Sequence, residues 1–210
     1  MSELADHAVL VAVSKTKPAE EIQAMYDLGQ RDFGENYVQE LTEKASQLPN
    51  DIRWHFIGHL QSNKVKYIAP FVHLVHGVDS VGLLKEINKQ GLKNNRVIDC
   101  LLQVHIAREE TKFGFDEGEL EQLNLEGFNN IGIRGMMGMA SFSDDKELVR
   151  SEFQQLKKLF DQYAPIIGAG SDFNILSMGM SGDYPIALEE GSNMVRIGSL
   201  LFGERNKQQG

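Results

Sequence analysis

The sequence predicts an α/β protein, with a single domain over residues 1–210 folded as a closed (β/α)8 barrel of the TIM type. Short apolar strands alternate with amphipathic helical stretches along the whole chain, which indicates a parallel sheet covered by helices. Eight such units fit a closed barrel better than an open sheet. No Gly-x-Gly-x-x-Gly pattern follows the first strand, which disfavours a dinucleotide-binding fold. No linker, low-complexity run or repeat divides the chain, so we expect one domain.

The expected strands are short runs whose apolar and β-branched residues suit a sheet that is buried on both faces. The first is the clearest, because Ala8 to Val13 is apolar throughout. In chain order the runs are Val9–Val13, Asp32–Phe33, Trp54–Ile57, His73–Gly77, Val97–Ile106, Ile133–Met139, Ile175–Ser177 and Val195–Ile197.

Amphipathic stretches between these strands predict the helices. In chain order they are Ala19–Leu28, Val38–Gln47, Ser62–Ala69, Val81–Gln90, Glu117–Leu123, Lys146–Tyr163 and Tyr184–Glu190. Pro18 suits the start of the first helix because proline cannot continue a strand. Asp144 or Ser143 would cap the longest helix. The glycines expected to end helices are Gly29, Gly91 and Gly191.

Composition excludes several classes of partner. The 210 residues are 41% hydrophobic and 24% charged, as in an ordinary soluble globular protein. The net charge is −9 and there is no dense block of lysine and arginine, so we expect neither nucleic acid nor a membrane as a partner. Cys100 is the only cysteine, which excludes an internal disulfide and predicts a buried, inert thiol. Met1–His7 lacks the pattern of a leader, which predicts a cytoplasmic protein, and we expect a monomer.

Polar side chains and one methionine stand at or near the ends of predicted strands, where a (β/α)8 barrel gathers its chemistry. They are Lys15, Asn36, His55, Met139, Ser177 and Arg196. Partial desolvation of Lys15 would leave more of its amine uncharged, and such an amine can form a Schiff base with a carbonyl compound. A solvated lysine at a strand end is the alternative, and Lys17 is a rival for the same chemistry.

Two segments near the C-terminus have small residues that allow the backbone to approach an anion. They are Ser177–Asp183 and Arg196–Ser199, which follow the last two strands, where barrels of this kind bind phosphate. Ordinary turns are the alternative for both segments. Arg196 lies within a strand, so its charge needs a definite partner. That partner is either a carboxylate, such as Glu35 or Asp172, or the ring nitrogen of a cofactor. A reactive lysine, a phosphate cradle and this cation together indicate pyridoxal phosphate (PLP).

Seven segments carry a resemblance to a known family: Ala12–Pro18, Phe33–Glu40, Trp54–Lys64, Lys112–Gly114, Arg134–Ala140, Ser177–Ser181 and Val195–Gly203. On these segments the chain resembles the pyridoxal phosphate homeostasis protein family. The barrel of that family is similar to the N-terminal domain of alanine racemase, which is fold type III of PLP-dependent proteins. The resemblance spans nearly the whole chain. One departure is the short stretch before the first strand, where the family normally has a helix.

The resemblance implies a role for each candidate residue. Lys15, rather than Lys17, would hold PLP as an aldimine, and Arg196 would face the pyridine nitrogen. Ser181, Gly198 and Ser199 would hold the phosphate, with Ser177 also in the cofactor site. The ring pocket would be lined by Asn36, His55 and Met139. No metal site is expected, because the histidines lack metal-ligand spacing with cysteines or carboxylates; they include His73, His76 and His105.

The implied function is PLP binding in intracellular vitamin B6 homeostasis and amino- and keto-acid balance, without strong catalytic turnover. Apo PLP-dependent enzymes would be the recipients of the cofactor. Racemisation needs an acid–base group on each face of the substrate, and we expect no second domain after Gly210 to supply the second group. Arg196 beside the pyridine nitrogen would also oppose its protonation. The alternatives are a small PLP-dependent racemase or other Schiff-base enzyme, and a barrel that binds another phosphorylated metabolite without a covalent bond.

Overall fold

The computed structural model describes residues 8–108, 113–167 and 172–203. Two features of the sequence interpretation lie outside these residues, namely the segment Met1–His7 and Lys112 of the motif Lys112–Gly114.

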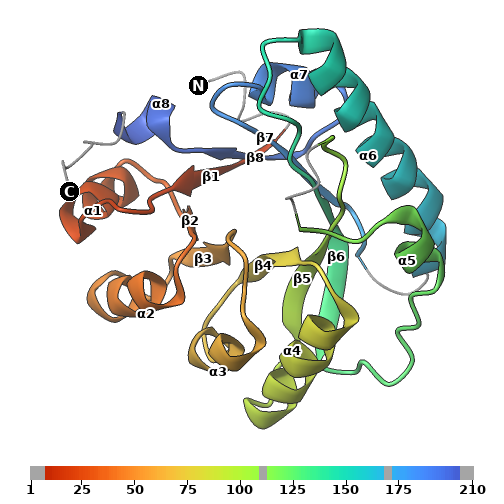
Figure 1. Ribbon diagram of the computed structural model, residues 1–210. Coiled ribbons are helices and arrows are strands. Elements are labelled where there is room, and N and C mark those ends of the chain that lie inside the picture. The colour runs from red at the N-terminus through yellow and green to blue at the C-terminus, as the bar shows by residue number, and fades with distance from the viewer. Residues whose placement is uncertain (1–7, 109–112, 168–171, 204–210) are drawn as a thin grey trace.

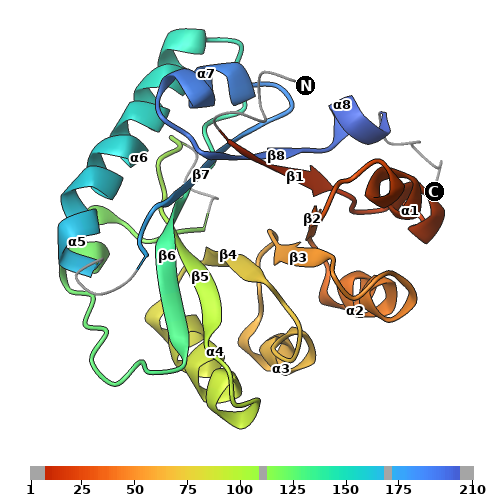
Figure 2. The ribbon, with the colours of Figure 1, turned by 180° about the vertical axis from the view of Figure 1, so that it is seen from behind.

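Eight parallel strands close into a barrel in chain order, as the alternating pattern predicts. Each strand pairs with the next one along the chain, and β8 pairs with β1. Figures 1 and 2 show the helices outside the ring of strands. The strands are β1 Val9–Val13, β2 Asp32–Glu35, β3 Arg53–Phe56, β4 Leu74–Val78, β5 Ile98–Gln103, β6 Ile131–Met137, β7 Ile175–Met180 and β8 Met194–Ile197.

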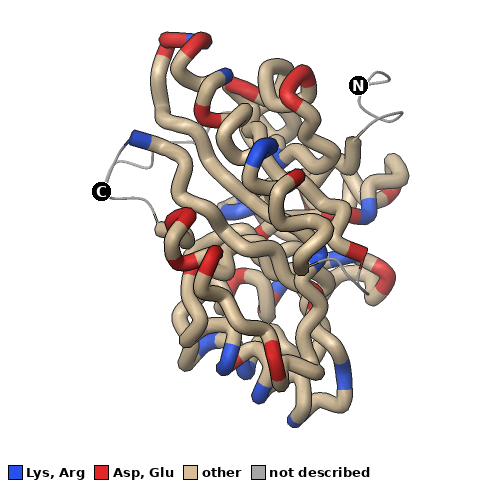
Figure 3. The backbone as a smooth tube through the Cα atoms, turned by 90° about the vertical axis from the view of Figure 1, so that its right-hand side faces the viewer, with Lys and Arg blue, Asp and Glu red and all other residues tan. Residues whose placement is uncertain are grey.

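The helices follow the strands and cover the outside of the barrel. They are α1 Ala19–Asp27, α2 Val38–Gln47, the 3₁₀ turn η1 Ser62–Lys64, α3 Val65–Ile68, α4 Val81–Lys93, α5 Glu117–Glu121, α6 Lys146–Ile167, α7 Tyr184–Glu189 and α8 Ser199–Phe202. Among the described residues no helix is long and apolar enough to cross a membrane. Figure 3 shows residues of both charge signs over the molecule, with basic residues most frequent toward the lower end of that view.

Several predicted boundaries were wrong. The stretch Ser62–Ala69 is a 3₁₀ turn followed by a short helix, and the turn Ser199–Phe202 was not expected as a helix. Gly91 does not end α4, which continues to Lys93. The start of α6 is capped by neither Ser143 nor Asp144: the side chain of Asp145 accepts hydrogen bonds from the backbone of Glu147 and Leu148. Local composition indicates where a helix lies, but it fixes the first and last residues only to within a few positions.

Side chains of each strand alternate between the barrel interior and the layer beneath the helices. A large apolar cluster, which includes Phe33, Trp54 and Phe153, joins strands to helices. A second, smaller cluster comprises Val11, Leu74, Leu101, Met137 and Met194, which lie on strands only. Cys100 belongs to the large cluster, and burial raises the pKa of its thiol, as expected of an inert cysteine. Polar side chains fill the part of the barrel interior that the small cluster does not occupy, and they contribute to the site described next.

Candidate functional site

A cavity of about 490 Å³ opens at the C-terminal ends of the strands, and we call it the C-terminal cavity. Its lining comes from the ends of β1, β7 and β8 and from the loops after β2, β3 and β6. Seven of the nine candidate residues line it: Lys15, Asn36, Met139, Ser181, Arg196, Gly198 and Ser199. His55 and Ser177 do not belong to its lining.

Lys15 lies in a tight turn at the end of β1. The backbone N–H of Lys17 donates to the carbonyl of Ser14 at 3.0 Å, which closes the turn around Lys15 and Thr16. Thr16 has a φ of +65°, a left-handed conformation that is rare for a β-branched residue. Such strain is found where the surrounding structure fixes the backbone. The backbone that carries Lys15 is therefore held in one conformation.

A cluster around Lys44 of α2 fixes this turn, and we call it the Lys44 clamp: Ser14, Glu35, Glu40 and Lys44. The Lys44 amine donates to the Ser14 carbonyl at 2.8 Å, to Glu35 at 2.7 Å and to Glu40 at 2.6 Å. The Glu40 carboxylate also accepts the backbone N–H of Thr16 at 2.6 Å. The hydroxyl of Ser14 donates to Glu35 at 2.6 Å. Burial raises the pKa of Glu35, although Lys44 and Ser14 act to lower it.

The rival lysine, Lys17, is directed to another partner. Its amine donates to the backbone carbonyl of Phe202 in α8 at 2.6 Å and lies 3.6 Å from the Glu21 carboxylate. Lys17 lines the C-terminal cavity as well, but these contacts hold its amine against α8. The Lys17 amine is therefore engaged by α8 and Glu21.

Arg196 reaches the C-terminal cavity from inside the barrel. Its side chain is buried, and burial lowers the pKa of its guanidinium to about 10, so it keeps its charge at neutral pH. It donates to the Ser177 hydroxyl at 2.6 Å and to the Gly138 carbonyl at 3.1 Å. Neither carboxylate suggested by the sequence is its partner. Glu35 binds Lys44, and Asp172 binds Arg134.

Ser177 and His55 belong to a buried chain of hydrogen bonds that we call the barrel relay: Arg196, Ser177, His76, His55 and Asp32. The His76 ring lies 3.2 Å from the Ser177 hydroxyl and 2.9 Å from the His55 ring. His55 Nε2 lies 3.0 Å from the Asp32 carboxylate. Burial lowers the pKa of His76 far below its ordinary value, which keeps that ring neutral.

His55 and Ser177, which the resemblance places in the cofactor site, thus lie behind the C-terminal cavity and not in its lining. β7 continues to Met180, so Ser177 lies inside the strand, not at its end. The ring of His55 points into the barrel, where it reaches the Asp32 carboxylate at the opposite end from the C-terminal cavity. Ser177 contacts the site through Arg196, and His55 does so only through the relay.

The loops after β7 and β8 meet at one wall of the C-terminal cavity. The Ser181 hydroxyl accepts the backbone N–H of Gly198 at 3.3 Å. The carboxylate of Asp183 accepts the backbone N–H of Met180 at 2.6 Å and so tightens the turn that presents Ser181. Gly179 adopts a φ of +97° beside this turn, a conformation that favours glycine. The two loops thus lie together, as expected for loops that follow neighbouring strands of a barrel.

Asn36 supplies a polar group that is not satisfied within the protein. Its side-chain carbonyl oxygen is buried and has no hydrogen-bond partner among the described residues. Buried acceptors of this kind are rare unless a water or a ligand satisfies them. Because Asn36 lines the C-terminal cavity, this acceptor is available to a donor on a water or a ligand bound there.

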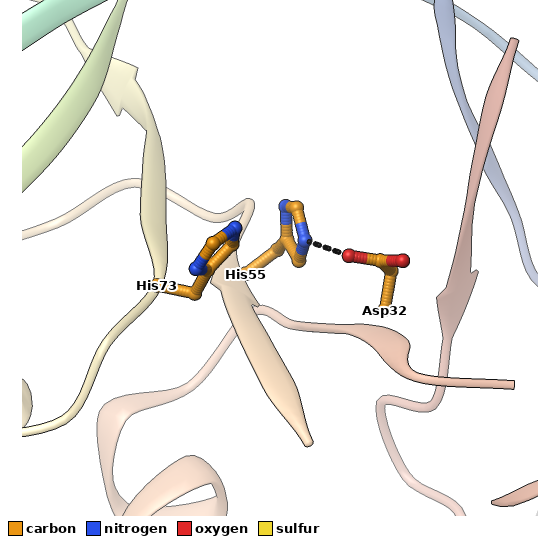
Figure 4. A group of neighbouring side chains, drawn as sticks. All are labelled: Asp32, His55 and His73. Carbon is orange, nitrogen blue, oxygen red and sulfur yellow. Dashed lines mark hydrogen bonds and ion pairs between the residues drawn. The ribbon is translucent and has the colours of Figure 1, made fainter. Parts of the chain in front are cut away.

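A second cavity, of about 360 Å³, lies at the N-terminal ends of the strands, and we call it the N-terminal cavity. Asp32, His55 and His73 converge there, with one ligand atom from each within 4.8 Å of the others. Figure 4 shows the two imidazole rings and the carboxylate side by side. The three residues come from three different parts of the chain, so no sequence spacing indicated this cluster.

Charges at the N-terminal cavity are mostly paired. Arg53 donates to both oxygens of Asp32, and Arg134 binds Asp99 at 2.8 Å. Burial acts to raise the pKa of Asp32, but hydrogen bonds from His55 and Arg53 outweigh it and hold that pKa well below its usual range. Partial desolvation of its ring lowers the pKa of His73, although the residue is exposed.

The comparisons with known proteins agree with this architecture. The family model of the alanine racemase N-terminal domain matches residues 1–206. The pyridoxal phosphate homeostasis protein of Aquifex aeolicus is 42% identical over 206 residues, which cover 94% of this chain and 87% of that protein. The human pyridoxal phosphate homeostasis protein is 40% identical over 211 residues, which cover 94% of this chain and 76% of that protein.

A solved structure shows the same fold with ligand. PipY of Synechococcus elongatus, determined with PLP bound, matches with a TM-score of 0.84 at 33% identity. The match covers 93% of this chain and 92% of PipY. The closed eight-stranded barrel, the family model and the curated relatives lead to one conclusion. This chain belongs to the pyridoxal phosphate homeostasis protein family.

Proposed function

We propose that this chain binds PLP in the C-terminal cavity, attached to Lys15, and serves intracellular PLP homeostasis without fast catalytic turnover. One observation carries the proposal: Lys15, Arg196 and the loops of Ser181 and Gly198 line one cavity. Relatives that the match covers over 76–87% of their length carry the name of PLP homeostasis proteins, and PipY holds PLP in the same fold.

The residues present fit the groups of PLP. Its aldehyde would meet the Lys15 amine, and its phosphate would meet Ser181, Gly198 and Ser199. The unsatisfied oxygen of Asn36 suits a donor on the ring or its attached group. The volume of the cavity, about 490 Å³, lies in the ordinary range for small-molecule sites.

Arg196 favours binding of PLP over catalytic turnover. When bound, PLP supplies an electron sink for carbanion chemistry, which is strongest with a protonated ring nitrogen. A buried guanidinium that keeps its charge opposes that protonation by like-charge repulsion. The contacts of Arg196 with Ser177 and Gly138 hold the cation in place.

The acid–base groups of the C-terminal cavity also support PLP binding without fast turnover. Racemisation requires a second proton donor or acceptor opposite the lysine. Among the described residues that line the C-terminal cavity, the titratable groups are Lys15, Lys17, Asp183 and Arg196. Lys17 is bound to Phe202, and Asp183 accepts the backbone N–H of Met180. Neither is placed as a free second base.

The proposal is tested by the absorbance of the full-length protein after incubation with PLP. We expect a visible band that becomes resistant to dialysis after borohydride reduction, with the label on the peptide containing Lys15. Lys15→Ala should lose the band, whereas the matched variant Lys17→Ala should keep it. A label on another lysine, or no band at any PLP concentration, would refute PLP attachment at Lys15.

A proton-exchange measurement on the same protein distinguishes a carrier of PLP from an enzyme. Amino-acid substrates incubated with the loaded protein in deuterium oxide should keep their α-proton over many hours. Exchange on the timescale of ordinary turnover, about one per second or faster, would instead favour a small racemase. Whether apo PLP-dependent enzymes are the recipients is tested by mixing loaded protein with such an enzyme and measuring its regained activity in the presence of a trap for free PLP.

A further inference from the structure

We propose that the N-terminal cavity holds a divalent first-row transition metal ion, bound by Asp32, His55 and His73. The site lies at the opposite end of the barrel from the C-terminal cavity and is separate from PLP binding. Two imidazoles and one carboxylate with open remaining positions form a donor set that such ions favour. The three ligand atoms already lie within 4.8 Å of one another.

The spacing of His55 and Asp32 suits an octahedral ion. His55 Nε2 and Asp32 Oδ1 are 3.0 Å apart. With bonds of about 2.1 Å, neighbouring corners of an octahedron are about 3.0 Å apart, and those of a tetrahedron about 3.4 Å. An ion about 2.1 Å from both atoms would lie about 1.5 Å to the side of the line that joins them, so the His55 ring and the Asp32 carboxylate must turn toward it on binding.

His73 completes the set from the solvent side. It directly precedes β4, its side chain is exposed, and its ring packs edge-on against that of His55 with 5.4 Å between centroids. No hydrogen bond to the His73 ring occurs within the described part of the chain, so both ring nitrogens are available. Opposite corners of an octahedron are about 4.2 Å apart, which a rotation of this exposed side chain can reach.

The surrounding charges leave room for a cation. Besides Asp32, the cavity is lined by the carboxylates Asp99 and Asp172 and by the guanidinium groups Arg53 and Arg134, so the acidic groups exceed the basic ones by one. Arg53 is the competitor of the metal, because it binds both oxygens of Asp32. Its side chain is 47% exposed and can turn into solvent.

Metal binding also sets the tautomer of His55. A metal on Nε2 places the ring proton on Nδ1, so His55 becomes the donor to His76. His76 must then accept at Nε2 and carry its proton on Nδ1, toward the Ser177 hydroxyl. No net proton is gained or lost by the two rings. Ser177 then receives hydrogen bonds from both Arg196 and His76, so its hydroxyl proton must turn away from His76.

Isothermal titration of the full-length, tag-free protein with Ni²⁺ tests the site at neutral pH. Ni²⁺ is chosen because imidazole sites bind it more tightly than Co²⁺ or Mn²⁺. We expect one site, and we expect His73→Ala to weaken it by about tenfold or more. Arg53→Gln should strengthen binding, since it frees Asp32 from its competitor. Mg²⁺ should not compete, because it prefers oxygen ligands.

His59→Ala is the matched control. Like His73, His59 is exposed; its ring lies 2.9 Å from the Asp79 carboxylate, and it follows β3 at the other end of the barrel. Its loss should leave Ni²⁺ affinity within about twofold. Absence of binding, equal affinity of His73→Ala and the native protein, equal losses in both histidine variants, or no gain in Arg53→Gln would each overturn the proposal.

The same titration on Lys15→Ala keeps this proposal distinct from PLP binding. That variant should bind Ni²⁺ like the native chain, because Lys15 lies at the other end of the barrel. Failure of PLP attachment with intact Ni²⁺ binding would contradict the proposed function alone.

Discussion

Replacing Lys44 by methionine should destabilise the protein strongly, because this lysine neutralises a carboxylate that has no access to water. Lys44 has 8% of its side chain exposed and Glu35 has none. The Glu35 oxygen Oε2 has no hydrogen-bond partner among the described residues. The hydrogen bonds from Lys44 and Ser14 to Oε1 therefore compensate for the burial of this carboxylate. Methionine keeps the length of the side chain and removes its charge.

The size of the effect follows from the uncompensated charge. Removing one partner of a buried ion pair costs about 3–5 kcal/mol. Replacing both partners with apolar residues removes the unpaired charge, so Glu35→Leu combined with Lys44→Met should recover part of that loss. The remainder reflects Ser14 and Glu40, which lose hydrogen bonds in the double variant. Lys158→Met is the control, because Lys158 is exposed on α6 and its loss should change the free energy of unfolding by less than about 0.5 kcal/mol.

Urea unfolding followed by circular dichroism measures these free energies, and its pH dependence tests the cause. Burial raises the pKa of Glu35, and loss of Lys44 should raise it further. A carboxyl group whose pKa is higher in the folded than in the unfolded state takes up a proton on folding, so lower pH favours folding. The deficit of Lys44→Met should therefore shrink between about pH 8 and about pH 5. A deficit below about 1 kcal/mol, or one that does not change with pH, would refute this reasoning.

Two further predictions concern backbone conformation. Gly135 has a φ of +153°, and a Cβ there would lie 1.8 Å from the Ile175 carbonyl oxygen, so Gly135→Ala should lower the free energy of unfolding by about 3 kcal/mol or more. Gly82→Ala in α4 meets no atom and should raise it by about 0.5–1 kcal/mol; equal effects in urea unfolding would contradict the steric argument. Thr16→Gly should be neutral or slightly stabilising, because it relieves a left-handed threonine, whereas Thr42→Gly inside α2 should cost about 0.3–0.5 kcal/mol. A loss at Thr16 as large as that at Thr42 would show that the turn is not strained.

The fold could be predicted because its signal is local and repeats along the chain. Every predicted strand overlaps one of the eight observed strands, since a short apolar run between two amphipathic stretches is typical of a buried strand. Ends were less accurate. β7 continues three residues beyond Ser177, because Met178, Gly179 and Met180 can extend a strand as readily as they form a loop.

The candidate site was predictable where it depends on strand ends. Lys15, Asn36 and Arg196 lie at one cavity because parallel strands bring their C-terminal ends together. How deep a side chain lies within the barrel could not be predicted, because no pattern in the sequence indicates it. Asp32 and His55 face each other across neighbouring strands, and the closing contact with His76 depends on the stagger of three strands. In the Lys44 clamp the Glu40–Lys44 pair has the i,i+4 spacing of helical neighbours, but the contact of Lys44 with Ser14 joins a helix to the turn of a different βα unit and has no signal in the spacing.

The barrel relay limits how this interior can change in evolution. When its histidines are uncharged, the two ends of the relay fix the direction of every hydrogen bond in it, because an arginine only donates and a carboxylate only accepts. His76, between Ser177 and His55, must then present one donor and one acceptor at fixed positions. A lone substitution by an apolar residue would strand two neighbours without a partner. Drift at these positions must therefore proceed by paired replacements, so this column of the barrel should diversify more slowly than the apolar layer around it.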